Sequence, residues 1–139
     1  FFFNDTATTE IYTSLFVRQR QMCIRDRTLP AGFMENAETL QDGALRETIE
    51  ETGSKAKVIM PYTMFSLPHI NQVHMFYLAD LLDDNFGPTF ESSDVQLFDT
   101  KDILWDEIAF PTVKKTLEYY IEDLKKNEFI FREEDIKLW

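Results

Sequence analysis

The pattern of hydrophobic and polar residues predicts two amphipathic helices. In the first, over residues 39–52, apolar and small side chains recur at the spacing that places them on one helix face. Thr39 suits the N-cap position, and Gly53 ends the pattern as glycine commonly does after a helix. The second helix is predicted over residues 112–126. The predicted packed faces are Leu45, Thr48, Ile49 and Thr52 in the first helix, and Val113, Leu117, Tyr120, Ile121 and Leu124 in the second.

Further segments carry the β-branched and aromatic residues that favour strands, and turn residues separate them. Pro61 lies inside the first of these segments, which indicates either an edge strand or a bulge. Gly87 and Pro88 mark a loop over residues 83–94, and a helical turn is expected within residues 102–108. Strands combined with packed helices predict a single domain of mixed α/β layers. The predicted strands are residues 57–67, 72–82 and 95–99.

Composition and charge narrow the classes of partner. The chain has 139 residues, of which 44% are hydrophobic, so one domain can bury a core. The 14 basic and 25 acidic residues give a net charge of −11, which repels phosphate backbones, and we expect no nucleic-acid binding. Cys23 is the single cysteine, which excludes a disulfide framework and favours a reducing compartment such as the cytoplasm. No apolar run reaches membrane-spanning length, so no membrane partner is expected.

Residues 1–27 differ in character from the rest of the chain. NDTATTEIYT, residues 4–13, resembles a translated sequencing adapter, and MCIRDR, residues 22–27, resembles a translated transposon end used in library preparation. On this interpretation residues 1–27 are an artefactual or disordered segment, and the domain is a partial one over residues 28–139. An added strand around residues 11–17 is the alternative interpretation.

The segment RETIEETG, residues 46–53, gathers acidic side chains near the end of the first predicted helix. Glu47, Glu50 and Glu51 share one helix face, so their charges repel one another. The helix dipole also disfavours anions at a C-terminal end. A solvated acidic face is one explanation for the cluster. A hard divalent cation such as Mg²⁺ or Mn²⁺ is another, because oxygen ligands suit these ions and a cation cancels the repulsion.

The residues before this cluster extend the pattern. From residue 32 to residue 54 the chain reads GFMENAETLQDGALRETIEETGS, which resembles the Nudix box, a set of glycines, glutamates and an arginine at fixed spacing. Thr48 and Ser54 depart from residues that are usually aliphatic. The resemblance implies a Nudix α/β/α sandwich with a mixed sheet. The fixed positions are Gly32, Glu38, Arg46, Glu47, Glu50, Glu51 and Gly53.

The resemblance to the Nudix box implies a metal site. Glu47, Glu50 and Glu51 would bind Mg²⁺ (Mn²⁺ is the alternative), with the backbone carbonyl of Ala31 as a further ligand. The ions would bridge the phosphates of a substrate, stabilise their charge and lower the pKa of an attacking water.

The same resemblance implies catalytic roles. Arg46 would orient Glu47 through a charge-assisted hydrogen bond, and Glu38 would support the site. In many Nudix enzymes an acidic residue of a later loop serves as general base or extra ligand. The segment FESSD offers Glu91 or Asp94 for that role, with a solvated loop charge as the equal alternative.

Motifs outside the box resemble the Nudix group that hydrolyses FAD and ADP-ribose, whose bacterial members carry a zinc ribbon. They include TLPAGFMENAET, LPHINQVHMFYLADL and LWDEIAFPTVKKTLEYYIEDL. The implied reaction splits a nucleoside diphosphate linked to another moiety into AMP and a phosphorylated product. Members of this group also have strands before TLPAGF. We therefore expect a sheet that is incomplete at its N-terminal strands, with residues 11–17 as a chance replacement strand.

Other polar and aromatic residues have weaker signals. His69 and Gln72 are candidates for the substrate pocket, although a histidine between strands is more often structural. Phe65, Phe76 and Tyr77 are candidates for stacking on a base, but core packing is the stronger interpretation for them. Trp105 and Phe110 are also assigned to the core.

The sequence thus predicts a magnesium-dependent hydrolase acting on a small-molecule nucleotide, with a homodimer left open. A Nudix-like domain that binds a nucleotide without cleaving it is one alternative. An inactive fragment is the other.

Overall fold

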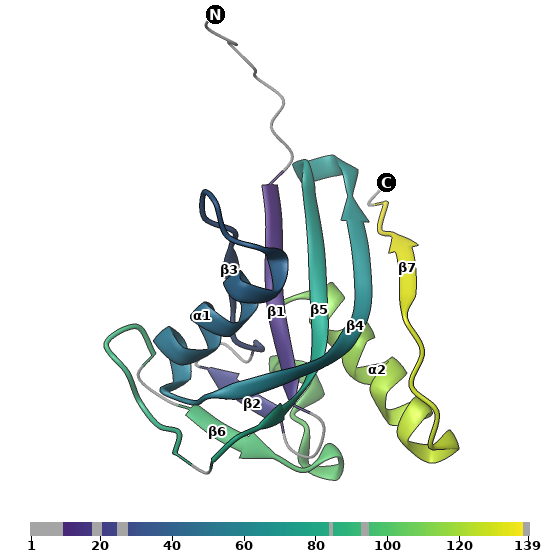
Figure 1. The fold of residues 1–139 in the computed structure, drawn as a ribbon. Coiled ribbons are helices and arrows are strands. Elements are labelled where there is room, and N and C mark those ends of the chain that lie inside the picture. Colours follow the sequence, from purple (N-terminus) through teal and green to yellow (C-terminus); the bar gives the residue numbers. More distant parts are fainter. Residues whose placement is uncertain (1–9, 18–20, 25–27, 84, 93–94, 138–139) are drawn as a thin grey trace, which may run out of the picture.

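A mixed five-stranded sheet with a helix on each face forms the body of the molecule (Figure 1). The computed structural model describes residues 10–17, 21–24, 28–83, 85–92 and 95–137. In spatial order the strands of this sheet are β3 (Ala31–Phe33), β1 (Glu10–Val17), β5 (Gln72–Leu81), β4 (Ala56–Leu67) and β7 (Arg132–Asp135). A two-stranded sheet pairs β2 (Gln21–Ile24) with β6 (Val95–Phe98). The helices are α1 (Leu40–Thr52) and α2 (Pro111–Lys126), with short 3₁₀ turns η1 (Pro68–Ile70), η2 (Thr100–Asp102) and η3 (Trp105–Glu107).

Strand β5 lies at the centre of the sheet and sets its mixed character. It runs parallel to β1 and antiparallel to β4, and β4 in turn runs parallel to β7. The mixed α/β layers predicted from the sequence are therefore confirmed. The segment of residues 11–17 does form a strand, since β1 pairs with β5 over its whole length and with β3 on its other side. In the ladder with β5, β4 shifts register on both sides of Pro61, so of the two interpretations of that proline the bulge is confirmed.

Alternate side chains of β4 and β5 enter separate cores on the two faces of the sheet. Phe65, Phe76 and Tyr77 are buried, as predicted, and Trp105 packs against the core. Phe110 is 41% exposed at the start of α2, so its assignment to the core is wrong. The core on the α2 face consists of Leu29, Tyr62, Phe65, Leu67, Phe76, Leu78, Val113, Leu117 and Tyr120. The core on the α1 face consists of Ala44, Met75, Tyr77, Ala79 and Val95.

Helix α1 turns a face of small residues toward the sheet. Ala44, Thr48 and Thr52 are fully buried at a spacing of one helical turn. The two threonine hydroxyls donate to the backbone carbonyls one turn earlier, so each buried hydroxyl has a hydrogen-bond partner. Ile49 is instead 47% exposed, and its predicted place on the packed face is wrong because it lies one step further round the helix. Leu124 of α2 is exposed for the same reason.

Polar contacts hold α2 to the sheet as well. Thr116 and Thr63 share a 2.8 Å hydrogen bond between their hydroxyls, both buried. The Tyr62 hydroxyl donates to Asp123 over 2.8 Å, and Arg132 donates to both oxygens of the same carboxylate. Asp123 is only 1% exposed, so these bonds replace the water that this charge has lost.

Two strands after residue 27 have no signal in the hydrophobic pattern. β3 follows a proline and reads as a turn, while β7 has the sequence REED, which lacks apolar residues. Charged partners stabilise β7 instead: Arg132 binds Asp123, and Glu134 pairs with Lys115 of α2.

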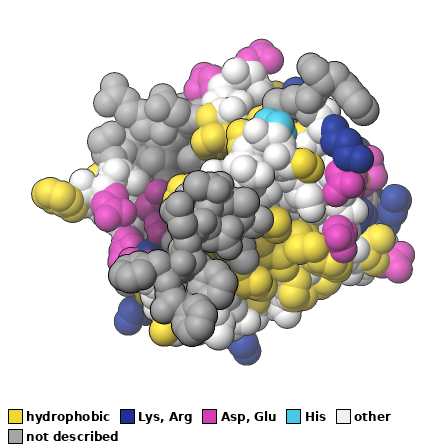
Figure 2. All heavy atoms as spheres, turned by 90° about the horizontal axis from the view of Figure 1, so that it is seen from above, with side chains coloured by type: hydrophobic (Ala, Val, Ile, Leu, Met, Phe, Trp, Pro, Cys, Tyr) yellow, Lys and Arg dark blue, Asp and Glu magenta, His cyan; other side chains and the backbone are white. Residues whose placement is uncertain are grey.

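Hydrophobic side chains also reach the surface. The view of Figure 2, from the end where β4 turns into β5, shows a band of them bordered by acidic and basic side chains. Within the described ranges, no helix is long and apolar enough to cross a membrane.

Candidate active site

Helix α1 carries the predicted carboxylates, and its ends are those expected from the sequence. The Thr39 hydroxyl accepts a hydrogen bond from the Asp42 backbone N–H over 3.1 Å and so caps the first turn. Gly53 ends the helix with a φ of 70°, a left-handed conformation that glycine adopts without strain. These ends place Glu47, Glu50 and Glu51 in the last two turns of the helix.

At one position of β3, an added side chain would collide with a carboxylate of α1. A Cβ atom on Gly32 would lie 2.1 Å from the carboxyl carbon of Glu47 and as close to one of its oxygens. Any side chain there would displace this carboxylate. The first glycine of the box therefore leaves space for the Glu47 side chain.

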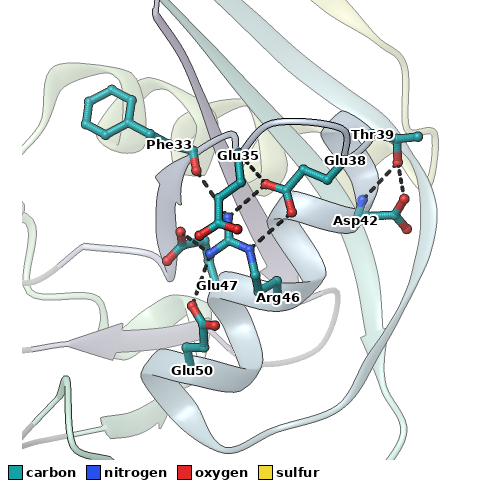
Figure 3. Close-up of polar contacts among 8 residues, drawn as sticks. All are labelled: Phe33, Glu35, Glu38, Thr39, Asp42, Arg46, Glu47 and Glu50. Carbon is teal, nitrogen blue, oxygen red and sulfur yellow. Dashed lines mark hydrogen bonds and ion pairs between the residues drawn. The ribbon is translucent and has the colours of Figure 1, made fainter.

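Arg46 lies at the centre of the polar contacts drawn in Figure 3. Its Nε and Nη2 bind the two oxygens of Glu38 over 3.1 and 2.8 Å, and Nη2 also donates to the Phe33 carbonyl. Its Nη1 donates to Glu47 over 2.7 Å and to Glu50 over 3.0 Å. The bonds to Glu38, Glu47 and Glu50 raise the pKa of Arg46 well above its usual value, while its hydrogen bonds lower the pKa of Glu38. Arg46 thus ties the β3–α1 loop to the carboxylates and neutralises part of their charge.

Glu51 turns toward β3. One of its oxygens accepts the Ala31 backbone N–H over 2.8 Å. Burial raises the pKa of Glu51 to about 7; the Ala31 bond opposes this shift, and the charges of Glu47, Glu91 and Glu50 add to it. The structure therefore joins Glu51 to Ala31 through the N–H of Ala31, whereas the role proposed for Ala31 as a ligand involves its carbonyl.

The loop after β5 is fastened to the C-terminal end of α1. The Gly87 N–H donates to the Thr52 carbonyl over 3.0 Å, and the Thr89 hydroxyl donates to the Glu51 carbonyl over 3.3 Å. The same hydroxyl accepts the N–H groups of Glu91 and Ser92, each over 3.2 Å. Thr89 thereby satisfies a free carbonyl of the helix end and shapes the turn that carries Glu91.

The fastened loop brings Glu91 to the helix carboxylates. Single carboxylate oxygens of Glu47, Glu50 and Glu91 all lie within 4.8 Å of one another, and Glu50 and Glu91 are exposed to solvent. Mg²⁺ binds oxygen at about 2.0–2.1 Å in an octahedron, so opposite ligands are about 4 Å apart. These acids therefore fit a hard divalent cation after a small closing movement. Asp94, the other candidate in this loop, lies outside the described residues.

The other predicted site residues lie elsewhere. His69 is exposed in η1, and Gln72 begins β5, at the turn that Figure 1 shows far from the C-terminal end of α1. Gln72 Oε1 lies 3.0 Å from Nε2 of His74, and His74 Nδ1 lies 3.0 Å from the Thr112 hydroxyl. Burial lowers the pKa of His74 to about 4, so its ring is neutral at pH 7. This histidine, which lies within β5, has a structural role.

Fold and carboxylates together define an α/β domain with a candidate divalent-cation site between a helix end and a loop. A protein-family model described as NUDIX domain matches residues 4–120. The chain therefore belongs to the Nudix family, and the family resemblance found in the sequence is confirmed.

Individual relatives agree with this assignment. The chain is 36% identical over 77 residues to the NAD-capped RNA hydrolase NudC of Vibrio parahaemolyticus; the match covers 55% of this chain and 30% of NudC. A crystal structure of a NUDIX hydrolase from Nitrosomonas europaea superposes with a TM-score of 0.89 at 35% identity, over 95% of this chain and 81% of that one. An ADP-ribose pyrophosphatase from Streptococcus suis has a TM-score of 0.71 at 19% identity, over 91% and 99% of the two chains, and shares the fold.

Proposed function

We propose that the chain is a Mg²⁺-dependent pyrophosphohydrolase that cleaves a nucleoside diphosphate linked to another moiety. FAD, ADP-ribose or a similar compound would yield AMP and a second phosphorylated product. The convergence of the Glu47, Glu50 and Glu91 carboxylates carries this proposal. The relatives include an NAD-capped RNA hydrolase and an ADP-ribose pyrophosphatase, which supports a diphosphate-linked nucleotide as the substrate class.

The residues that would hold Mg²⁺, or Mn²⁺, are Glu47, Glu50, Glu51 and Glu91, with the Ala31 carbonyl as a further candidate. When bound, the metal supplies positive charge for the diphosphate and lowers the pKa of a water molecule. The protein's own part is to keep the oxygens converged. Arg46 does this for Glu47 and Glu50 with one guanidinium nitrogen, and Glu38 holds the guanidinium from the other side.

Glu91 is the proposed general base. Its side chain is exposed and lies beside Glu47 and Glu50, so it can face a water molecule that approaches the diphosphate. A carboxylate in that place would take the proton of the water as the new bond to phosphorus forms. His69 and Gln72, at the far turn, would contact the part of a long substrate that extends away from the carboxylates.

The test is product release by the purified chain from a panel of nucleoside diphosphate derivatives. With Mg²⁺ we expect AMP from FAD or ADP-ribose by chromatography, none with EDTA, and loss of turnover in Glu50→Gln. No product from any compound of the panel would refute the hydrolase assignment. Nucleotide binding by calorimetry without turnover would favour the binding-domain alternative.

A further inference from the structure

The aromatic residues suggested by the sequence as stacking partners for a base are not available to a ligand. Phe65, Phe76 and Tyr77 have exposed fractions of 1%, 0% and 6% and lie in the two cores. A planar substrate ring therefore needs another partner. One aromatic side chain beside the carboxylates is fully open to solvent: Phe90, which immediately precedes Glu91.

Hydrogen bonds hold the backbone around Phe90, while its ring is fully exposed. The Thr89 N–H donates to the Ser92 carbonyl over 2.8 Å, which closes a four-residue turn with Phe90 near its tip. The contact of Thr89 with the Glu51 carbonyl anchors this turn to α1. A phenyl ring in water forgoes the burial that usually stabilises it, so a ring held open at a fixed place suits a partner that arrives later.

The position of Phe90 also suits this role. Successive Cα atoms lie about 3.8 Å apart, so Phe90 borders the place where Glu91 meets Glu47 and Glu50. When the diphosphate of a substrate is bound at these carboxylates, the sugar and base attached to it extend outward past Phe90. Phe33, another exposed phenylalanine near the site, is a poorer candidate, because Figure 3 shows its ring directed away from Glu47 and Glu50.

We propose that Phe90 stacks on a planar heteroaromatic ring of the substrate and thereby determines which nucleotides the site accepts. The inference rests on the proposed hydrolase function. Stacking holds ground state and transition state alike, so its loss should raise KM and leave kcat unchanged. Alanine substitution of a residue that stacks on a base weakens binding by roughly 5- to 100-fold.

The experiment compares wild type, Phe90→Ala, Phe90→Trp and the control Phe131→Ala in steady-state hydrolysis of ADP-ribose and FAD with Mg²⁺. Phe131 is also an exposed phenylalanine, but it lies between α2 and β7. We expect a KM increase of about 5- to 100-fold for Phe90→Ala, recovery in Phe90→Trp and no change in Phe131→Ala. An effect on both substrates identifies adenine as the stacked ring, and an effect on FAD alone identifies the flavin; either result supports the proposal.

Equal KM values for wild type and Phe90→Ala, in an active enzyme, would overturn the stacking and leave the hydrolase assignment intact. If wild type cleaves neither substrate, the hydrolase assignment fails instead. Calorimetric binding of AMP and FAD then decides whether Phe90 stacks on a ring of the ligand. Weaker binding by Phe90→Ala than by Phe131→Ala supports the stacking. Equal binding, or no binding by wild type, overturns it.

Discussion

Gly32→Ala should separate activity from stability. The new Cβ would lie 2.1 Å from the Glu47 carboxyl carbon. Ordinary carbon contacts are about 3.5 Å, so this carboxylate must move by roughly 1.4 Å. That shift breaks its 2.7 Å bond to Arg46 and takes it out of the cluster with Glu50 and Glu91. A misplacement of about 1 Å at a reacting centre costs about 100-fold in rate, which is the expected loss of kcat.

The fold should tolerate the same change. Only the flexible end of one glutamate has to move, and the pair with Arg46 is partly exposed, so the loss of stability should stay below about 1 kcal/mol. The assay is kcat and Mn²⁺ affinity, with the melting temperature measured on the same samples. Gly87→Ala is the control, because a Cβ there meets nothing within 4 Å. Wild-type kcat and Mn²⁺ affinity in Gly32→Ala would refute the reasoning.

Three further predictions concern stability. The pKa of Glu51 is raised to about 7 in the folded protein, so its protonated carboxyl adds stability at low pH that is lost as pH rises through 7. The melting temperature measured in EDTA should therefore fall as pH rises over this range. An equal fall in Glu51→Gln would contradict this. Asp123→Ala removes the carboxylate that buried Tyr62 and half-buried Arg132 bind, and it should cost about 3–5 kcal/mol in urea unfolding. Exposed Glu122→Ala should cost under about 0.5 kcal/mol, and equal effects of the two substitutions would speak against the buried network. Deleting residues 1–27 removes β1, which pairs with β5. Circular dichroism should then show loss of the cooperative thermal transition. An unchanged transition would mean that β1 contributes little to stability.

Local signals in the sequence were sufficient to predict α1 and to name many residues of the candidate site. Thr39 and Gly53 act as caps through contacts a few residues away, so the sequence determines the bounds of α1 closely. The spacing from Gly32 to Gly53 similarly identified the box. The spacing could not show why residue 32 is a glycine, because the Glu47 side chain comes close to it only when β3 packs on α1.

Contacts distant in sequence account for the features that no local pattern shows. Glu91 reaches Glu47 and Glu50 only because Thr89 and Gly87 bind the carbonyls at the end of α1, and nothing local in FESSD indicates this. Strand β7 has no apolar pattern, since ion pairs with α2 hold it. Ile49 was misplaced because periodicity gives the width of a helix face more reliably than its centre.

The attachment of the Thr89 turn to α1 determines which part of the protein opens first on heating. The turn is held by a few surface hydrogen bonds, whereas the sheet is held by two apolar cores. Local opening therefore requires less free energy than global unfolding. Detachment of the turn would carry Glu91 and Phe90 away together while the helices stay folded. Reversible inactivation should then precede the melting transition, and amide hydrogens of Glu91 and Ser92 should exchange sooner than those of β5.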